Sequence, residues 1–166
     1  MTTLIGLKAE KGKQGVILAS DLSRTQTTWS AQGDVAYRQQ RKSEGQKIYV
    51  DNKREVALCM SGVFDQLYTD FLSKVIAGEI DIRGAVLNGF FPELKSLNEE
   101  RWDGRLPDRE YMSGLLIATR TANPELYTCF PLGRVEKRAF TSIGSGSNYA
   151  LTHIAMQDKL IPRGLS

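Results

Sequence analysis

Residues 2–21 read TTLIGLKAEKGKQGVILASD and contain two short strand-like runs joined by a polar turn. In the first run, alternate residues from Thr3 to Ala9 fall on one face, which is the period of a β-strand. The second run, Val16 to Ala19, follows the turn KGKQG. The two runs therefore predict an antiparallel hairpin at the start of the chain.

The composition is that of an ordinary globular protein. The chain has 166 residues, which suggests one domain, and 41% of them are hydrophobic and 25% charged. The formal net charge is only +3, and the densest basic piece, Arg38 to Lys42, has no interleaved aromatic residues that could stack on bases. We therefore expect no nucleic-acid partner and read this piece as part of a solvated loop.

The two cysteines, Cys59 and Cys129, lie far apart within apolar runs and form no C-x-x-C pair. Buried free thiols in a reducing compartment fit this pattern best. No apolar run approaches the roughly 20 residues that span a bilayer, and residues 1–20 lack the zones of a signal peptide. The expectation is a cytoplasmic protein without a membrane partner.

Further along the chain, strands alternate with helices. Residues 22–45 are polar without a sustained period and predict a long loop. An apolar stripe of helical period begins at Phe64 and ends before Gly78. A second helical stretch runs from about Ile82 to Leu97 and should break near Pro92. The remaining expected elements are a hairpin of strands 47–50 and 55–60, a charged connection at 98–110, strands at 114–118, 126–130 and 135–140, and a closing helix after 144–147.

This order of elements predicts an α+β fold with antiparallel sheets and helices outside them, in a single domain over residues 1–166. Four short motifs follow one another at the expected strand ends: Thr2-Thr3, VILASD at 16–21, Lys47-Ile48 and Ser61-Gly62. A fifth, GSGSNYA at 144–150, precedes the closing helix. Together, and in this order, they resemble the proteasome β-type subunits and the bacterial HslV peptidases, which are N-terminal nucleophile hydrolases.

The resemblance implies a four-layer αββα sandwich of antiparallel sheets. It covers the chain from Thr2 to about Leu160, where the resembling proteins continue into further helices and strands. We therefore expect this domain to be C-terminally short and to lack those last elements. The basic residue that the family usually carries two positions after its aspartate is replaced here by Ser23, with Arg24 one position later.

The chemistry begins at Thr2, which follows Met1 directly. If Met1 is removed, Thr2 presents a hydroxyl nucleophile and a free α-amine on one residue. An α-amine has an ordinary pKa of about 7.7 to 8.0 and can act as the base near neutral pH. The resemblance places Lys47 beside the hydroxyl and Asp21 beside the lysine, where the carboxylate would hold the lysine charged and oriented.

The resemblance assigns three further roles. The backbone N–H of Gly62 is expected to contact the oxyanion, since glycine lets the backbone approach a substrate closely. Ser145 is expected to complete the hydrogen-bond network around the amine. Met60, two residues before the glycine, is expected to line the substrate pocket and to favour a hydrophobic side chain. The resemblance implies no metal and no cofactor.

Each residue also has a purely structural interpretation. Asp21 is compatible with a turn after a buried strand, Lys47 with an exposed strand end, and Ser61-Gly62 with a helix cap. His153 is more typical of a packed or exposed helix residue than of a base, because no serine or cysteine nucleophile motif accompanies it.

The function predicted from the sequence is a threonine-type endopeptidase that hydrolyses unfolded polypeptides inside a proteasome-like ring. The ring would be homo-oligomeric or hetero-oligomeric, with α-type subunits or a regulatory ATPase as possible partners. Two alternatives stay open at this point. One is a non-catalytic β-like structural subunit, and the other is an N-terminal nucleophile amidohydrolase or transpeptidase that acts on a specific amide.

Overall fold

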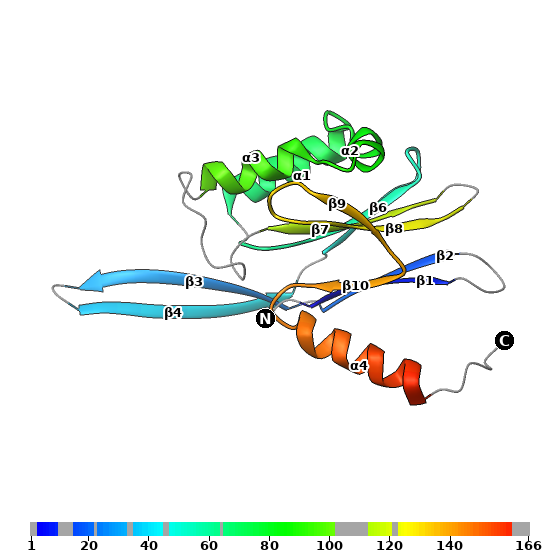
Figure 1. The fold of residues 1–166 in the computed structure, drawn as a ribbon. Helices are drawn as coiled ribbons and strands as arrows, with labels where there is room; N and C mark the ends of the chain where they lie inside the picture. Colours follow the sequence, from blue (N-terminus) through cyan, green and yellow to red (C-terminus); the bar gives the residue numbers. More distant parts are fainter. Residues whose placement is uncertain are drawn as a thin grey trace.

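A computed structural model describes residues 3–9, 15–21, 23–32, 35–44, 47–63, 65–101, 113–120 and 123–160. Within these ranges ten strands form three antiparallel sheets, and four α-helices accompany them. The predicted α+β class with antiparallel sheets is confirmed. The helices between residues 66 and 101 lie on one side of the strands, and the helix that follows the last strand lies on the other (Figure 1).

The three-stranded sheet contains the predicted N-terminal hairpin. Its strand order is β10-β1-β2, with bounds Phe140–Ile143, Leu4–Ala9 and Gly15–Ser20. Leu4 lies opposite Ser20 on one side and Ile143 on the other. The sheet therefore brings the start of the chain next to the segment that enters the closing helix.

The five-stranded sheet is a meander in the order β5-β6-β7-β8-β9. Its β5–β6 hairpin is the one predicted from residues 47–60. The bounds are Ile48–Asp51 for β5, Val56–Ser61 for β6, Gly114–Thr119 for β7, Glu125–Cys129 for β8 and Val135–Arg138 for β9.

Three helices cover the outer face of the five-stranded sheet: α1 (Gln66–Ala77), α2 (Ile82–Asn88) and α3 (Pro92–Arg101). The main hydrophobic core lies between them and the sheet. As predicted, α1 ends at Gly78, which adopts a φ of 84°, and the second helical stretch breaks before Pro92. None of the helices in the described ranges combines the length and apolar character needed to cross a membrane.

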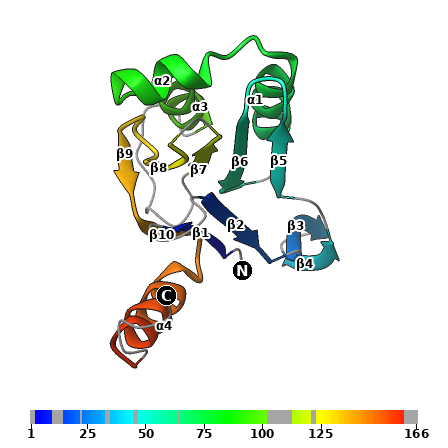
Figure 2. The ribbon, with the colours of Figure 1, turned by 90° about the vertical axis from the view of Figure 1, so that its right-hand side faces the viewer.

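A second, smaller core fills the space between the two larger sheets. Its fully buried members are Leu4, Cys59 and Leu116. Gly6 lets the sheets approach closely, because a Cβ atom there would lie 2.7 Å from Leu126 Cδ1. On the far side of the three-stranded sheet, α4 (Ser147–Leu160) lies near β10 and β1, and Figures 1 and 2 show it extending away from them.

The prediction of a long loop over residues 22–45 is wrong. Residues Ser23–Gln32 (β3) and Val35–Glu44 (β4) form a two-stranded antiparallel ribbon, with Trp29 opposite Arg38. In Figure 1 the ribbon projects sideways from the body, and it pairs with no other strand of the described chain. The ribbon sequence has no sustained apolar alternation, so its strand character rests on the β propensity of its threonines.

Two boundaries also differ from the prediction. Residues 98–101, expected in a charged connection, are the last turn of α3. The strand expected at 135–140 is interrupted at Ala139, so β9 pairs within the five-stranded sheet and β10 within the three-stranded one. The chain changes sheets at this residue, which a hydrophobicity pattern does not reveal.

Candidate functional site

Asp21 connects three segments that are distant in sequence. Its Oδ1 atom accepts a hydrogen bond from the Thr3 N–H at 2.7 Å and another from Lys47 Nζ at 3.0 Å. The Asp21 N–H in turn donates to the Thr3 carbonyl at 3.1 Å. The Lys47 side chain is only 6% exposed and that of Asp21 31%. The end of β2, the start of β5 and the beginning of the chain are thereby fixed together.

The predicted nucleophile Thr2 and the preceding Met1 lie outside the described residues. Their roles stay predictions. The Thr3 nitrogen, however, is the atom to which residue 2 is covalently attached, and this nitrogen is held by Asp21. The anchoring of Thr3 therefore fixes the attachment point of residue 2.

The glycine-serine turn before α4 packs against the same point. A Cβ atom on Gly146 would lie 2.0 Å from Thr3 Oγ1, so only glycine leaves room for the threonine side chain. Ser145, the predicted partner of the α-amine, is the neighbouring residue and is exposed. The structure thus brings the segments of Asp21, Lys47 and Ser145 together around Thr3.

Gly62, the predicted oxyanion residue, directly follows β6 in a conformation that suits glycine. Its φ is +133°, and a Cβ atom would lie 2.7 Å from the backbone Cα of Ser113. Alanine at this position would be strained and would clash with backbone. Gly62 is also solvent-exposed.

The direction of the Gly62 N–H follows from the ladder between β6 and β7. Arg120 N–H donates to the Glu55 carbonyl, and hydrogen-bonded pairs alternate along an antiparallel ladder. Every second residue from Glu55 along β6 therefore bonds to β7. Ser61 is one of these residues, and Gly62 is not. The Gly62 N–H therefore points away from β7, toward the side of β5, the strand that Lys47 precedes.

Met60 lies in the core on the helix side of the five-stranded sheet and is 2% exposed. Neighbours in this core include Tyr68 and Phe71. The side chain is therefore not open to solvent, and its predicted role in the substrate pocket stays a prediction.

The two thiols do not compete for the role of nucleophile. Burial raises the pKa of both Cys59 and Cys129 to about 12, so both are protonated at neutral pH. The two cysteines are free, as expected from the sequence. His153 is exposed on α4.

A group of polar residues near Gly62 was not predicted from the sequence. Arg101 and Asn98 project from the last turns of α3 and bind Ser113, the residue that packs against Gly62. The available signals were the helical spacing of Asn98 and Arg101 and the capping position of Asp65 before α1. They reach Gly62 only through Ser113 and Val63, an arrangement that depends on the tertiary fold.

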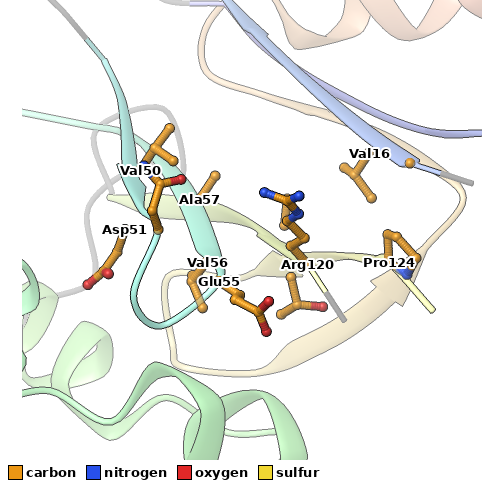
Figure 3. A pocket seen from close by; sticks show the side chains of 12 residues that line it. Val16, Val50, Asp51, Glu55, Val56, Ala57, Arg120 and Pro124 are labelled. Atoms are coloured by element: carbon orange, nitrogen blue, oxygen red, sulfur yellow. The ribbon is translucent and has the colours of Figure 1, made fainter. Parts of the chain in front are cut away.

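A cavity of about 520 Å³ lies at the opposite ends of the strands. Figure 3 shows Arg120 extending between Val16 of β2 and Ala57 of β6. The cavity is lined by the start of β2 and the end of β5, whereas Asp21 follows β2 and Lys47 precedes β5. It is therefore separate from the site around Thr3.

Comparison with known proteins assigns no family to the chain, so the role of the site is inferred from its geometry. No protein-family model and no curated protein matches the chain. Among the described residues, no three His, Cys, Asp or Glu side chains are grouped so that they could hold a metal ion.

Proposed function

We propose that this chain is a threonine-type endopeptidase in which Thr2, exposed by removal of Met1, is the nucleophile. The observation that carries the proposal is the double hydrogen bond to Asp21 Oδ1, from the Thr3 N–H and from Lys47 Nζ. A nucleophile at residue 2 is attached directly to the first of these donors. The second is a buried ammonium group, which favours an ionised hydroxyl nearby.

In the proposed reaction the free α-amine of Thr2 accepts the hydroxyl proton, directly or through a water molecule, as the oxygen attacks the peptide carbonyl. The Gly62 N–H donates to the resulting oxyanion. Collapse of this intermediate breaks the C–N bond, and the leaving amine takes up the proton. Water then hydrolyses the acyl ester on Thr2 and releases the second product.

The arrangement of layers supports the finer fold assignment. Helices α1–α3, the five-stranded sheet, the three-stranded sheet and α4 follow one another in the order of the αββα sandwich of N-terminal nucleophile hydrolases. We extend the proposal to a ring of proteasome β or HslV type, in the cytoplasm, that acts on unfolded polypeptides. Partners in the ring would be copies of this chain, α-type subunits or a regulatory ATPase.

Intact-mass measurement of the full chain after incubation with a peptide epoxyketone tests the enzyme. This probe closes a ring on a residue that carries both a hydroxyl and a free α-amine, so it requires an exposed Thr2. We expect Met1-free wild-type protein to gain one adduct and Thr2→Ala none. Thr2→Ser keeps both groups and should still be labelled.

An unlabelled chain that retains Met1 contradicts the proposal, and so does a Met1-free chain that is neither labelled nor able to cleave peptides. Either result favours the non-catalytic subunit. Labelling combined with hydrolysis of a small amide, but not of a denatured polypeptide, favours the amidohydrolase. Native mass spectrometry then tests the ring, since a monomer cannot enclose its substrate.

A further inference from the structure

One guanidinium group, that of Arg101 at the end of α3, holds both sides of the turn that contains Gly62. Its Nε and Nη2 atoms donate to the two carboxylate oxygens of Asp65, each at 2.7 Å. Nη2 also donates to the Val63 carbonyl at 3.1 Å, and Nη1 donates to Ser113 Oγ at 2.7 Å. The Arg101 side chain is only 5% exposed, so water competes little for these bonds.

Asn98, one helical turn before Arg101, fixes the backbone of Ser113. The Ser113 N–H donates to Asn98 Oδ1 at 2.8 Å, and Asn98 Nδ2 donates to the Ser113 carbonyl at 3.0 Å. Asn98 is 2% exposed and Ser113 is fully buried. Residues three apart lie on the same helix face, so α3 presents both side chains to Ser113.

Gly62 lies between the two groups that Arg101 holds. On one side it packs against the Ser113 backbone, and on the other the chain continues to Val63. The β6–β7 ladder supplies no partner for the Gly62 N–H, so the ladder alone does not fix this amide. The hydrogen bonds from Arg101 restrain the residues on both sides of it.

We propose that Arg101 is a positioning residue that fixes the direction of the Gly62 N–H through Val63, Asp65 and Ser113. The inference rests on the proposed peptidase, in which this amide stabilises the oxyanion. The positive charge of Arg101 is paired with the Asp65 carboxylate. Its contribution is therefore geometric, and the orientation of a preorganised donor has a large effect on rate.

The test compares variants at the two ends of α1. Arg101→Gln and Arg101→Lys change the contacts at the N-terminal end. Arg54→Gln is the matched control, because Arg54 Nη2 donates to the carbonyls of Val75 and Ile76 at the C-terminal end. Thermal unfolding of each variant shows that it is folded at the assay temperature and measures the stability that it has lost.

Peptide hydrolysis separates positioning from stability. Loss or displacement of one oxyanion donor typically lowers kcat by about 100-fold, so we expect Arg101→Gln to lower kcat by roughly 10-fold to 100-fold while KM changes less than about threefold. Arg101→Lys keeps the charge but not the forked geometry, and should fall in between. Arg54→Gln should keep kcat within about twofold. Equal losses of kcat in Arg101→Gln and Arg54→Gln would overturn the inference.

A readout independent of activity is the Gly62 amide signal in a ¹⁵N-labelled spectrum. We expect Arg101→Gln to shift it and to speed its hydrogen exchange, while Arg54→Gln leaves it in place. A folded Arg101→Gln protein with an unchanged Gly62 signal contradicts the inference, whatever its activity. If the wild-type chain neither cleaves peptides nor reacts with the epoxyketone, the proposed function fails, and the amide signal still decides whether Arg101 orients Gly62.

Discussion

At the scale of single residues, the site depends on the close approach of Gly146 to Thr3. The threonine side chain occupies the space that any Cβ at position 146 would need. The same threonine is bonded through its backbone to Asp21. A methyl group on residue 146 would therefore disturb the anchored start of the chain without removing a charged or catalytic group.

We expect Gly146→Ala to lower the free energy of unfolding by about 1–3 kcal/mol, the usual cost of overpacking, and to reduce labelling of Thr2 by the epoxyketone. Adding Thr3→Ala removes the Oγ1 atom that clashes. The double variant should therefore regain part of the free energy of unfolding and part of the labelling. Urea unfolding of the two single variants and the double variant measures this coupling.

Gly15→Ala is the control for this pair, because no heavy atom lies within 4 Å of a Cβ at that position. Its effect should stay within about 0.5 kcal/mol. Additive effects of Gly146→Ala and Thr3→Ala would show that the close contact is not what holds the start of the chain.

Some residues of the site could be predicted from the sequence, and others could not. The family resemblance placed Asp21 beside Lys47, and both stand at ends of predicted strands, where side chains can meet on one rim. Arg101 was not predicted, since it binds Asp65, which is 36 residues away, and its own segment was expected to be a connection. Such a contact follows only from the packing of α3 on the sheet.

At the scale of elements, α1 shows how one side chain can serve two purposes. Asp65 caps the helix by accepting the Tyr68 N–H at 2.9 Å and also pairs with Arg101. Burial alone would raise the pKa of Asp65, but the hydrogen bonds from Arg101 and Tyr68 outweigh it and lower the pKa below its ordinary value of 3.8. The ionised form is therefore the one that stabilises this end of α1.

A lowered pKa gives stability that is present above the unfolded-state value and is lost as the pH falls through the folded-state value. We expect Asp65→Asn to reduce the free energy of unfolding at neutral pH. The difference from the wild type should shrink as the pH falls below 3.8, because the wild-type carboxyl then also becomes neutral. Urea unfolding at a series of pH values measures this, and a difference that does not change with pH contradicts it.

The elements themselves were predictable where apolar residues repeat. The stripe from Leu67 to Val75 predicted α1, alternation predicted β1, and the short apolar run from Val16 to Ala19 predicted β2. The β3–β4 ribbon was missed because its sequence is mostly polar and follows no sustained period, and an isolated two-stranded ribbon has no core to impose a pattern. The division at Ala139 was missed because β9 and β10 differ only in the sheet to which they pair.

At the scale of the whole molecule, the two larger sheets are joined by polar contacts as well as by the small core. Thr128 Oγ1 on β8 donates to Thr141 Oγ1 on β10 at 2.8 Å, and both side chains are buried. Lys8 on β1 pairs with Glu125 on β8 at 2.7 Å. These contacts fix the alignment of the sheets, while Gly6 sets how closely they approach.

Because Gly6 sets the spacing of the sheets, the effect of Gly6→Ala on stability should change sign when Leu126 is also substituted. Gly6→Ala places a methyl group against the buried Leu126 and should cost about 1–3 kcal/mol. Leu126→Ala should cost about 2–5 kcal/mol because it opens a cavity. In the Leu126→Ala background, Gly6→Ala should instead stabilise the protein, since its methyl group partly fills that cavity.

Chemical denaturation of the four proteins checks this cycle. A destabilising effect of Gly6→Ala in both backgrounds would indicate that the sheets are separated by something other than this contact.

The Asp21–Lys47 ion pair lies where the β3–β4 ribbon joins the rest of the fold. The ribbon begins at Ser23 and ends at Glu44, and the two charged residues, 26 positions apart, close its base. Ten residues in each strand give the ribbon a reach of roughly 33 Å. A force that displaces β3 and β4 would therefore also strain the Asp21–Lys47 contact at the base of the ribbon.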